Sequence, residues 1–233
     1  MASRIHQAKA AATFAFDNLG IRKAAVFVDE GIQEAREMAV EFTDCFSAKG
    51  GTAIEASNLL NTGFTYACLE EILEHEPELL YLSCTAEIAT KIVIDAKKSG
   101  FRGLFLGHDT WDRSDLLRVG GEAVDGLYFT DYWSIGDPGK ANQNFIAAYR
   151  QKYKHNPNFI AAHAYDSMML MTDAIRRAGS TDGAKIRDAL QAVDMELATG
   201  RIRFDKDRNL IKSMVIKTIK AGKAVYHSTV EPA

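Results

Sequence analysis

Three short segments of this sequence carry side chains that could bind or react with a small molecule. They are DEGIQ at 29–33, SCTAE at 83–87 and GHDTWD at 107–112. Their hydroxyl, carboxylate, amide and imidazole groups are the kinds of polar group that fix a ligand's orientation in a concave site. The same residue types also cap helices and stabilise their first turns. Capping and ligand contact therefore both remain open for these segments.

The sequence contains few patterns that are typical of catalytic sites. The GxSxG nucleophile elbow, the GxxxxGK[ST] phosphate loop, the HExxH zinc motif and the GxGxxG dinucleotide motif do not occur. The six histidines are dispersed along the chain, and we identify no nucleophile–base pair. We expect non-covalent binding, with no catalytic residues, no cofactor and no metal.

The segment DKDRN raises the separate question of a calcium site. Asp205, Asp207 and Asn209 stand at the spacing that opens an EF-hand loop. Such a loop needs Gly at its sixth position and Glu at its twelfth, where this chain has Leu210 and Ile216. The flanking residues also have the pattern of strands instead of helices. We therefore expect a turn in which Asp and Asn side chains bond the local backbone.

The three cysteines, Cys45, Cys68 and Cys84, are widely spaced and form no CxxC pair. A zinc or redox motif usually has such closely spaced thiols. Free cysteine behaves as a small hydrophobic residue in protein cores. We therefore interpret these residues as buried or half-buried thiols.

The overall composition excludes some classes of partner. The chain has 233 residues, of which 47% are hydrophobic, and a formal net charge of −3. No basic block indicates nucleic acid, and no run approaches the roughly 20 apolar residues of a transmembrane helix. Residues 1–16 lack the apolar segment of a signal peptide, so this sequence is expected to carry no export signal.

Short apolar runs alternate with longer amphipathic stretches, and these elements must position the three polar segments. Such alternation predicts βαβ units, in which helices cover both faces of a parallel sheet. Open sheets of this kind bind ligands beyond the carboxyl ends of their strands, where the three polar segments are expected. The expected strands are 24–30, 52–57, 78–83 and 103–107, and the expected helices are 8–19, 33–49, 65–75 and 86–100.

The pattern changes after about residue 124. A helix with Phe145, Tyr149 and Tyr153 at four-residue spacing is followed by the break HNPN. A long helix is expected over 160–178, where Gly179 stops it. A shorter helix is then expected over about 184–193, and the last forty residues have the pattern of strands with turns at DKDRN and KAGK.

Four segments, taken in chain order, have a common likeness. The first is HQAKAAATFAFDNLGIRKAAVFVD, and the second is AKKSGFRGLFLGHDTWD. The third is NPNFIAAHAYDSMMLMTDAIRRAG, and the fourth is ATGRIRFDKDRNLIKSMVIKTIKAGK. Together they resemble the type I periplasmic binding proteins, specifically the branched-chain amino-acid receptor family of ABC transporters. The resemblance runs over nearly the whole chain.

This resemblance implies a Rossmann-like α/β fold and a role in solute uptake. Such receptors hold an amino acid or a similar small polar molecule in a cleft between two lobes, without catalysis. It also implies the membrane permease of an ABC importer as partner and a periplasmic or extracellular location. The alternative with the same fold is a ligand-sensing regulatory module, which a fused or neighbouring regulator would distinguish. A doubly wound enzyme would need a nucleophile or a cofactor motif.

The resemblance assigns the chain unequally to the two lobes. Residues 1–130 and 199–233 are expected to form the C-terminal lobe, and residues 131–198 a helical segment of an incomplete N-terminal lobe. The part of the family that supplies most of the N-terminal lobe has no counterpart in this sequence. The apolar face of the helix at 160–178 then needs another partner, because large exposed apolar patches are rare on monomers. We expect it to fold onto the remaining lobe or to pair with a second copy in a homodimer.

The resemblance also assigns ligand contacts by position. An acidic residue, typically Glu, binds the ligand's ammonium group in the family, and Asp109 occupies that position here. Trp111 would form an apolar wall, and Ser83 and Thr85 would add hydrogen bonds. A position that is often aromatic in the family carries Gln33. The full set of predicted ligand-binding residues is Gln33, Ser83, Cys84, Thr85, His108, Asp109 and Trp111.

Overall fold

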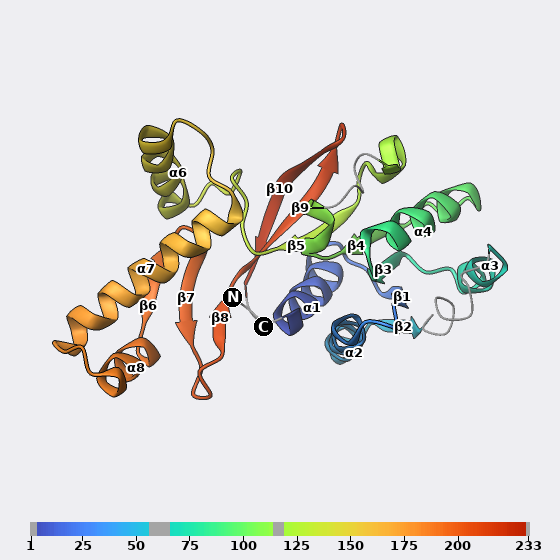
Figure 1. Ribbon diagram of the computed structural model, residues 1–233. Coiled ribbons are helices and arrows are strands. Elements are labelled where there is room, and N and C mark those ends of the chain that lie inside the picture. Colours follow the sequence, from blue (N-terminus) through green and yellow to red (C-terminus); the bar gives the residue numbers. More distant parts are fainter. Residues whose placement is uncertain (1–3, 56–65, 114–118, 232–233) are drawn as a thin grey trace.

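The computed structural model describes residues 4–55, 66–113 and 119–231, with the backbone alone at 66–68 and 113. Two sheets organise these residues (Figure 1). The larger has seven strands in the order β10-β9-β5-β4-β3-β1-β2, and the smaller has three in the order β6-β7-β8. The predicted α/β fold with a mostly parallel central sheet is confirmed.

Five neighbouring strands of the larger sheet run parallel, so their carboxyl ends lie along one edge. β1 lies between β2 and β3, with Ala24 opposite both Ala53 and Leu79. β9 pairs antiparallel with β5, and β10 pairs antiparallel with β9. The strands are β1 Lys23–Val28, β2 Thr52–Glu55, β3 Leu79–Ser83, β4 Leu104–Gly107, β5 Tyr128–Asp131, β9 Met214–Lys220 and β10 Lys223–Val230.

The two faces of the larger sheet bury different sets of side chains. Along β1, Ala24 and Val26 face one core cluster, whereas Ala25 and Phe27 face the other, because successive side chains of a strand point to opposite faces. The first cluster includes residues of α1 and α2, and the second includes residues of α3 and α4. The helices of this region are α1 Arg4–Thr13, its π-helical continuation η1 Phe14–Asn18, α2 Gln33–Ala48, α3 Tyr66–Glu74, α4 Ala86–Lys98, and the short 3-10 helices η3 Asp109–Arg113 and η4 Gly121–Val124.

Residues 132–212 form a second region, in which α6, α7 and α8 accompany the smaller sheet (Figure 1). The long helix α7 begins after Asn158, whose side chain accepts a hydrogen bond from the backbone N–H of Ala161 at 2.9 Å. It ends at Gly179, where φ is +57°, as the sequence predicted. The elements are α6 Lys140–Tyr153, α7 Phe159–Ala178, α8 Gly183–Gln191, β6 Asp194–Leu197, β7 Gly200–Phe204 and β8 Leu210–Lys212.

The strand β6 lies within the last forty residues, which have the pattern of strands, but the sequence did not identify it as a separate element. Asp194 and Glu196 are exposed, whereas Leu197 is buried, so the strand alternates over only four residues. Such a short run directly after a helix is hard to recognise from periodicity. Its identity as a strand comes from pairing with β7, in which Leu197 lies opposite Gly200.

The DKDRN segment forms the turn between β7 and β8. Asp205 Oδ1 accepts hydrogen bonds from the backbone N–H groups of Asp207 and Asn209, both at 2.8 Å. These bonds, that from Asn209 first, hold the pKa of the Asp205 carboxyl below its ordinary value. The expected turn is confirmed. Within the part of the chain that the structure describes, no three His, Cys, Asp or Glu side chains are grouped to hold a metal ion.

The structure describes the side chains of two of the three cysteines. Cys45 is half-buried and Cys84 is buried, and both are free, as predicted. The side chain of Cys68 lies outside the described residues. Among the helices of the described ranges, none is long and apolar enough to cross a membrane.

Candidate functional site

The three polar segments meet at the carboxyl edge of the larger sheet. They follow β1, β3 and β4, which are adjacent in the sheet. Val28 at the end of β1 lies opposite Ser83 at the end of β3. The backbone N–H of Asp29 then donates to the carbonyl of Ser83 at 3.0 Å. The parallel arrangement thus brings together segments that are far apart in the sequence.

A cavity of about 170 Å³ opens at this edge, with walls from all three segments. Ile32 comes from the segment after β1, Thr85 from that after β3, and His108 and Thr110 from that after β4. Apolar side chains from the buried stripe of α2 complete the floor. The lining residues are Arg4, Ile32, Ala35, Met38, Cys84, Thr85, Ala86, His108 and Thr110.

His108 bridges two of the segments at the wall of this cavity. Its Nε2 lies 3.1 Å from the carbonyl oxygen of Cys84, which can only accept, so Nε2 carries the proton. Its Nδ1 lies 3.2 Å from Oγ1 of Thr110. The imidazole thus joins the second and third segments and holds Thr110 at the rim.

Thr85 both caps a helix and lines the cavity. Its side-chain oxygen accepts a hydrogen bond from the backbone N–H of Ile88 at 3.5 Å, in the first turn of α4. The hydroxyl proton is not used in that bond. Capping and ligand contact, which the sequence left as alternatives, are therefore compatible at this residue.

Ser83 and Cys84 face the protein interior. Ser83 is fully buried, and its Oγ donates to the carbonyl of Ala35 at 2.7 Å, which fixes the start of α2 against β3. Cys84 lines the cavity floor, and burial raises the pKa of its thiol, so the group is neutral. The Ser83 hydroxyl and the Cys84 thiol therefore contribute to the shape of the site, and neither group is charged.

Gln33 is exposed at the first position of α2. Its amide nitrogen donates to Oε1 of Glu37 at 2.8 Å, one turn along the same helix. The preceding residue, Ile32, lines the cavity in its place. Ala35 and Met38 join it at the three-residue spacing of the buried stripe, which is the signal that could have identified them.

Asp109 and Trp111 are not among the residues that line this cavity. Asp109 is 7% exposed, and its Oδ1 accepts a hydrogen bond from Nε2 of Gln7 at 2.9 Å. Trp111 is 1% exposed and packs on Phe129 in the core, with their ring centroids 6.4 Å apart. A Cβ at Gly107 would approach the Trp111 ring to 2.2 Å, so the glycine admits the indole over β4. The predicted ligand contacts of Asp109 and Trp111 stay predictions.

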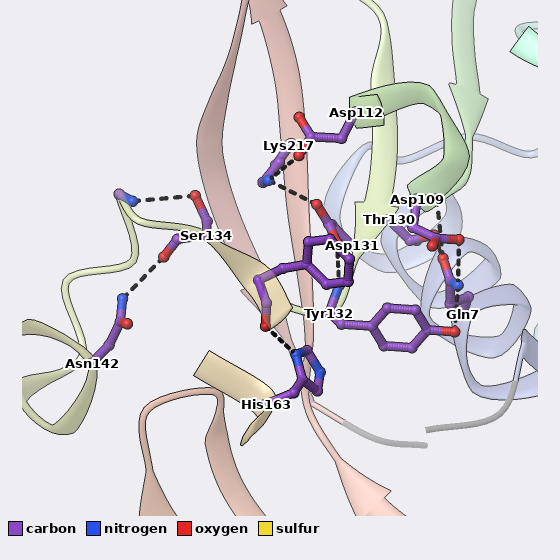
Figure 2. A network of polar contacts seen from close by, with 12 residues as sticks. Gln7, Asp109, Asp112, Thr130, Asp131, Tyr132, Ser134, Asn142, His163 and Lys217 are labelled. Atoms are coloured by element: carbon purple, nitrogen blue, oxygen red, sulfur yellow. Dashed lines mark hydrogen bonds and ion pairs between the residues drawn. The ribbon is translucent and has the colours of Figure 1, made fainter. Parts of the chain in front are cut away.

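A buried ion-pair cluster fixes the end of the third segment. Lys217 on β9 lies between two carboxylates, with Nζ 2.9 Å from Asp112 Oδ2 and 2.7 Å from Asp131 Oδ2 (Figure 2). Burial raises the pKa of the Asp131 carboxyl, and the ammonium group of Lys217 opposes that rise. The cluster attaches η3 to two strands of the larger sheet.

A second cavity, of about 440 Å³, is lined by α7, by the strands β7 and β8, and by His6 of α1. His163, Asp166 and Lys212 are among its polar walls. Asp166 accepts hydrogen bonds from the backbone N–H groups of Ala198 and Thr199 at 2.9 and 2.8 Å. That carboxylate holds the β6–β7 turn against α7, which accounts for its burial.

Comparison with known proteins agrees with this geometry. Residues 2–224 match the family described as periplasmic binding protein. A binding protein for leucine, isoleucine, valine, threonine and alanine from Pseudomonas aeruginosa is 27% identical over 115 residues, which are 49% of this chain and 31% of that protein. The chain thus spans about a third of that curated relative.

Two solved structures extend the likeness over the fold. A leucine-binding protein from Thermotoga maritima is 29% identical with a TM-score of 0.79, and the match covers 98% of this chain and 66% of that one. A branched-chain amino-acid transporter substrate-binding protein from Streptococcus pneumoniae, in complex with isoleucine, is 26% identical with a TM-score of 0.72 and the same coverage. The chain described here belongs to the periplasmic binding protein family, with the type I fold.

Proposed function

We propose that this protein is a solute-binding component of an ABC importer and binds an amino acid or a similar small carboxylate without catalysis. The observation that carries the proposal is the cavity at the carboxyl edge of the larger sheet, to which three strand-end segments contribute. This edge is where open parallel sheets bind ligands. The related structures named above are of proteins that bind leucine or isoleucine.

The cavity is lined mainly by apolar surface, to which a few polar groups are added. Ile32, Ala35 and Met38 suit a branched aliphatic or aromatic group of the solute. The hydroxyl groups of Thr85 and Thr110 offer hydrogen bonds at the rim, and the guanidinium of Arg4 attracts a carboxylate. At about 170 Å³ the cavity is smaller than the roughly 300–1,000 Å³ of typical ligand pockets, which supports a small solute or a site shared with a facing lobe.

The two regions supply the two lobes in this proposal. The larger sheet and its helices form one lobe, and residues 132–212 belong to the other. The sequence assigned residues 199–233 to the first lobe; because β7 and β8 pair with β6 in the smaller sheet, we propose instead that the chain returns to that lobe between β8 and β9. The permease of the importer is the protein partner, and the location is periplasmic or extracellular. Pairing of two copies through the exposed face of α7 also stays a proposal, which light scattering tests.

A thermal-shift screen followed by calorimetry tests solute binding. The probes are the twenty amino acids and the apolar carboxylates 4-methylpentanoate and benzoate. A ligand that binds only the folded protein stabilises it by about 2.7 kcal/mol at a hundredfold excess over Kd. We expect one chemical class to raise the melting temperature.

A pair of variants shows whether that binding occurs in the cavity described here. Thr110→Trp places an indole at the rim of the cavity and should abolish the shift. Thr181→Trp makes the same change at an exposed loop position and should preserve it. Absence of any shift in the wild-type protein, or an unchanged shift in the Thr110 variant, would contradict the proposal.

A further inference from the structure

Two lysines are buried in the part of the chain that the structure describes, and their surroundings differ. Lys217 is 7% exposed and lies between the carboxylates of Asp112 and Asp131 (Figure 2). Lys212, at the end of β8, is 3% exposed, and its Nζ donates to the carbonyl of Tyr132 at 2.7 Å. Within the described ranges, no carboxylate forms an ion pair with Lys212. A buried charge destabilises a fold unless it is paired.

The carboxylates nearest to Lys212 in their electrostatic effect are bound by other groups. Asp131 pairs with Lys217 at 2.7 Å. Asp166 accepts the two backbone N–H groups of the β6–β7 turn, and Asp137 accepts a backbone N–H of its own loop at 2.8 Å. The Tyr132 carbonyl accepts one of the three N–H donors of the Lys212 ammonium group, so a further acceptor can bind to it.

Lys212 lines the second cavity, whose volume of about 440 Å³ lies within the roughly 300–1,000 Å³ of typical ligand pockets. Arg208 is an exposed member of the same wall. Leu170, Ile202 and Phe204 add apolar surface. Among the residues that the structure describes, none lines both this cavity and the solute cavity at the sheet edge.

The charges on the wall of the second cavity favour an anion. Lys212 and Arg208 supply cations, and Asp166 supplies a carboxylate whose two oxygens already accept backbone N–H groups. Burial lowers the pKa of the imidazoles of His6 and His163, so these two groups become charged only as pH falls. A ligand with an anionic group and an apolar body therefore complements the wall.

We propose that the second cavity binds a small organic carboxylate, whose anionic oxygens pair with the ammonium group of Lys212 and whose apolar part lies against Leu170, Ile202 and Phe204. This site goes beyond the proposed function, because it is separate from the solute cavity and does not depend on solute binding there. His6 belongs to α1 and the other walls belong to the second region, so the bound carboxylate lies between the two regions.

Calorimetric titration of the Thr110→Trp variant tests this site, because the added indole blocks the solute cavity and leaves the second cavity open. The probes are 3-phenylpropanoate and 4-methylpentanoate, and each is compared with its uncharged amide. We expect each carboxylate to bind about tenfold more tightly than its amide, because it pairs with a buried charge. Adding Lys212→Met should remove this preference. Lys206→Met, which removes an exposed ammonium group from the turn between β7 and β8, should preserve it.

A second pair of variants covers the case in which Lys212→Met fails to fold. Ser167 and Thr172 are exposed residues of α7, and each hydroxyl donates to the carbonyl one turn earlier in the helix. Ser167 lines the cavity, whereas Thr172 does not. In the Thr110→Trp background, Ser167→Trp should abolish binding of both carboxylates, and Thr172→Trp should preserve it.

The pH dependence of binding tests the role of the ammonium group directly. Burial lowers the pKa of Lys212 to about 8, and a carboxylate binds the protonated form. Affinity should therefore fall about tenfold between pH 7 and pH 9. The same profile is measured for Lys212→Met and should be flat, which separates Lys212 from other groups near it. These groups are His6, Asp131, Asp137, His163, Asp166 and Arg208.

The outcomes separate this site from the solute cavity. Carboxylate binding that persists in Thr110→Trp, is lost in Ser167→Trp and weakens as pH rises would support it. The proposal would be overturned by equal affinity for carboxylates and amides, by unchanged binding in Ser167→Trp or in a folded Lys212→Met variant, or by no binding to the Thr110→Trp protein. Each of these results leaves solute binding at the sheet edge, which is measured in the wild type, unaffected.

Discussion

The two regions of this protein treat similar amphipathic helices differently. On the larger sheet, α2 has 16 residues and buries Phe42 and Phe46 completely. In the second region, α7 has 20 residues, of which Ala162, Asp166 and Ala174 are buried. Large apolar side chains on the rest of α7 are exposed. They are Ile160, Tyr165, Met168, Met169, Met171 and Ile175.

This difference shows what hydrophobic periodicity specifies. Both helices have an apolar face at helical spacing, so both were predicted from sequence. The face of α2 lies on a sheet, and stacked rings fill the space: Phe42 lies 4.0 Å from Tyr81 between centroids. The face of α7 is largely open in this chain, with Met168 65% exposed. Periodicity identifies the face, whereas the element that covers it is set by the tertiary structure.

The largest expected contrast between the regions is in apolar truncations. Phe42→Ala removes a fully buried ring and should lower the free energy of unfolding by about 3–5 kcal/mol, because it leaves a cavity. Met168→Ala on α7 should change it by less than about 0.5 kcal/mol. Urea denaturation measures both. A comparable cost for the two would show that α7 is covered in solution.

The second contrast concerns the carboxylate that organises the second region. Asp166→Ala leaves the buried N–H groups of Ala198 and Thr199 without their acceptor, which should cost roughly 2–4 kcal/mol. Asp173→Ala, on the same helix but in a surface pair with Arg177, is the matched control and should have little effect. Hydrogen exchange should locate the loss at the β6–β7 turn. Protection there that equals the wild type would refute this account.

The third prediction uses the buried lysine at the junction of the regions. Burial lowers the pKa of Lys212 to about 8, although nearby carboxylates oppose the shift. The unfolded chain therefore binds more protons than the folded one between about pH 8 and pH 10, and stability rises with pH in that window. Relative to Lys212→Met, the wild type should gain roughly 1–3 kcal/mol from pH 8 to pH 10. Parallel stability curves for the two proteins would exclude a depressed pKa.

The smallest effect is expected at the surface of the smaller sheet. Arg201 and Asp194 form a pair at 2.6 Å across β6 and β7, with both side chains about half exposed. Exposed pairs of this kind contribute little because water and salt screen them. Arg201→Met should leave the urea midpoint unchanged within error at high salt. A clear loss would mean that this edge is covered by a partner in solution.

The candidate site was predicted in part. The segments after three strands were identified because polar residues follow apolar runs, and parallel topology brings such segments together. The lining residues were predicted less well, since Ile32 and not Gln33 faces the cavity. Ile32 has an extended backbone just before α2, whereas Gln33 is the first residue of the helix, so their side chains point in different directions.

Local patterns determined the order of elements, the parallel sheet, the end of α7 at Gly179 and the Asp205 turn, because these depend on residues close in sequence. Only the tertiary structure decided the position of Asp109, which Gln7 holds from 102 residues away. It also placed Trp111 in the core over Gly107. Such contacts depend on how helices and strands pack against one another, and the sequence of either partner alone carries no record of the other.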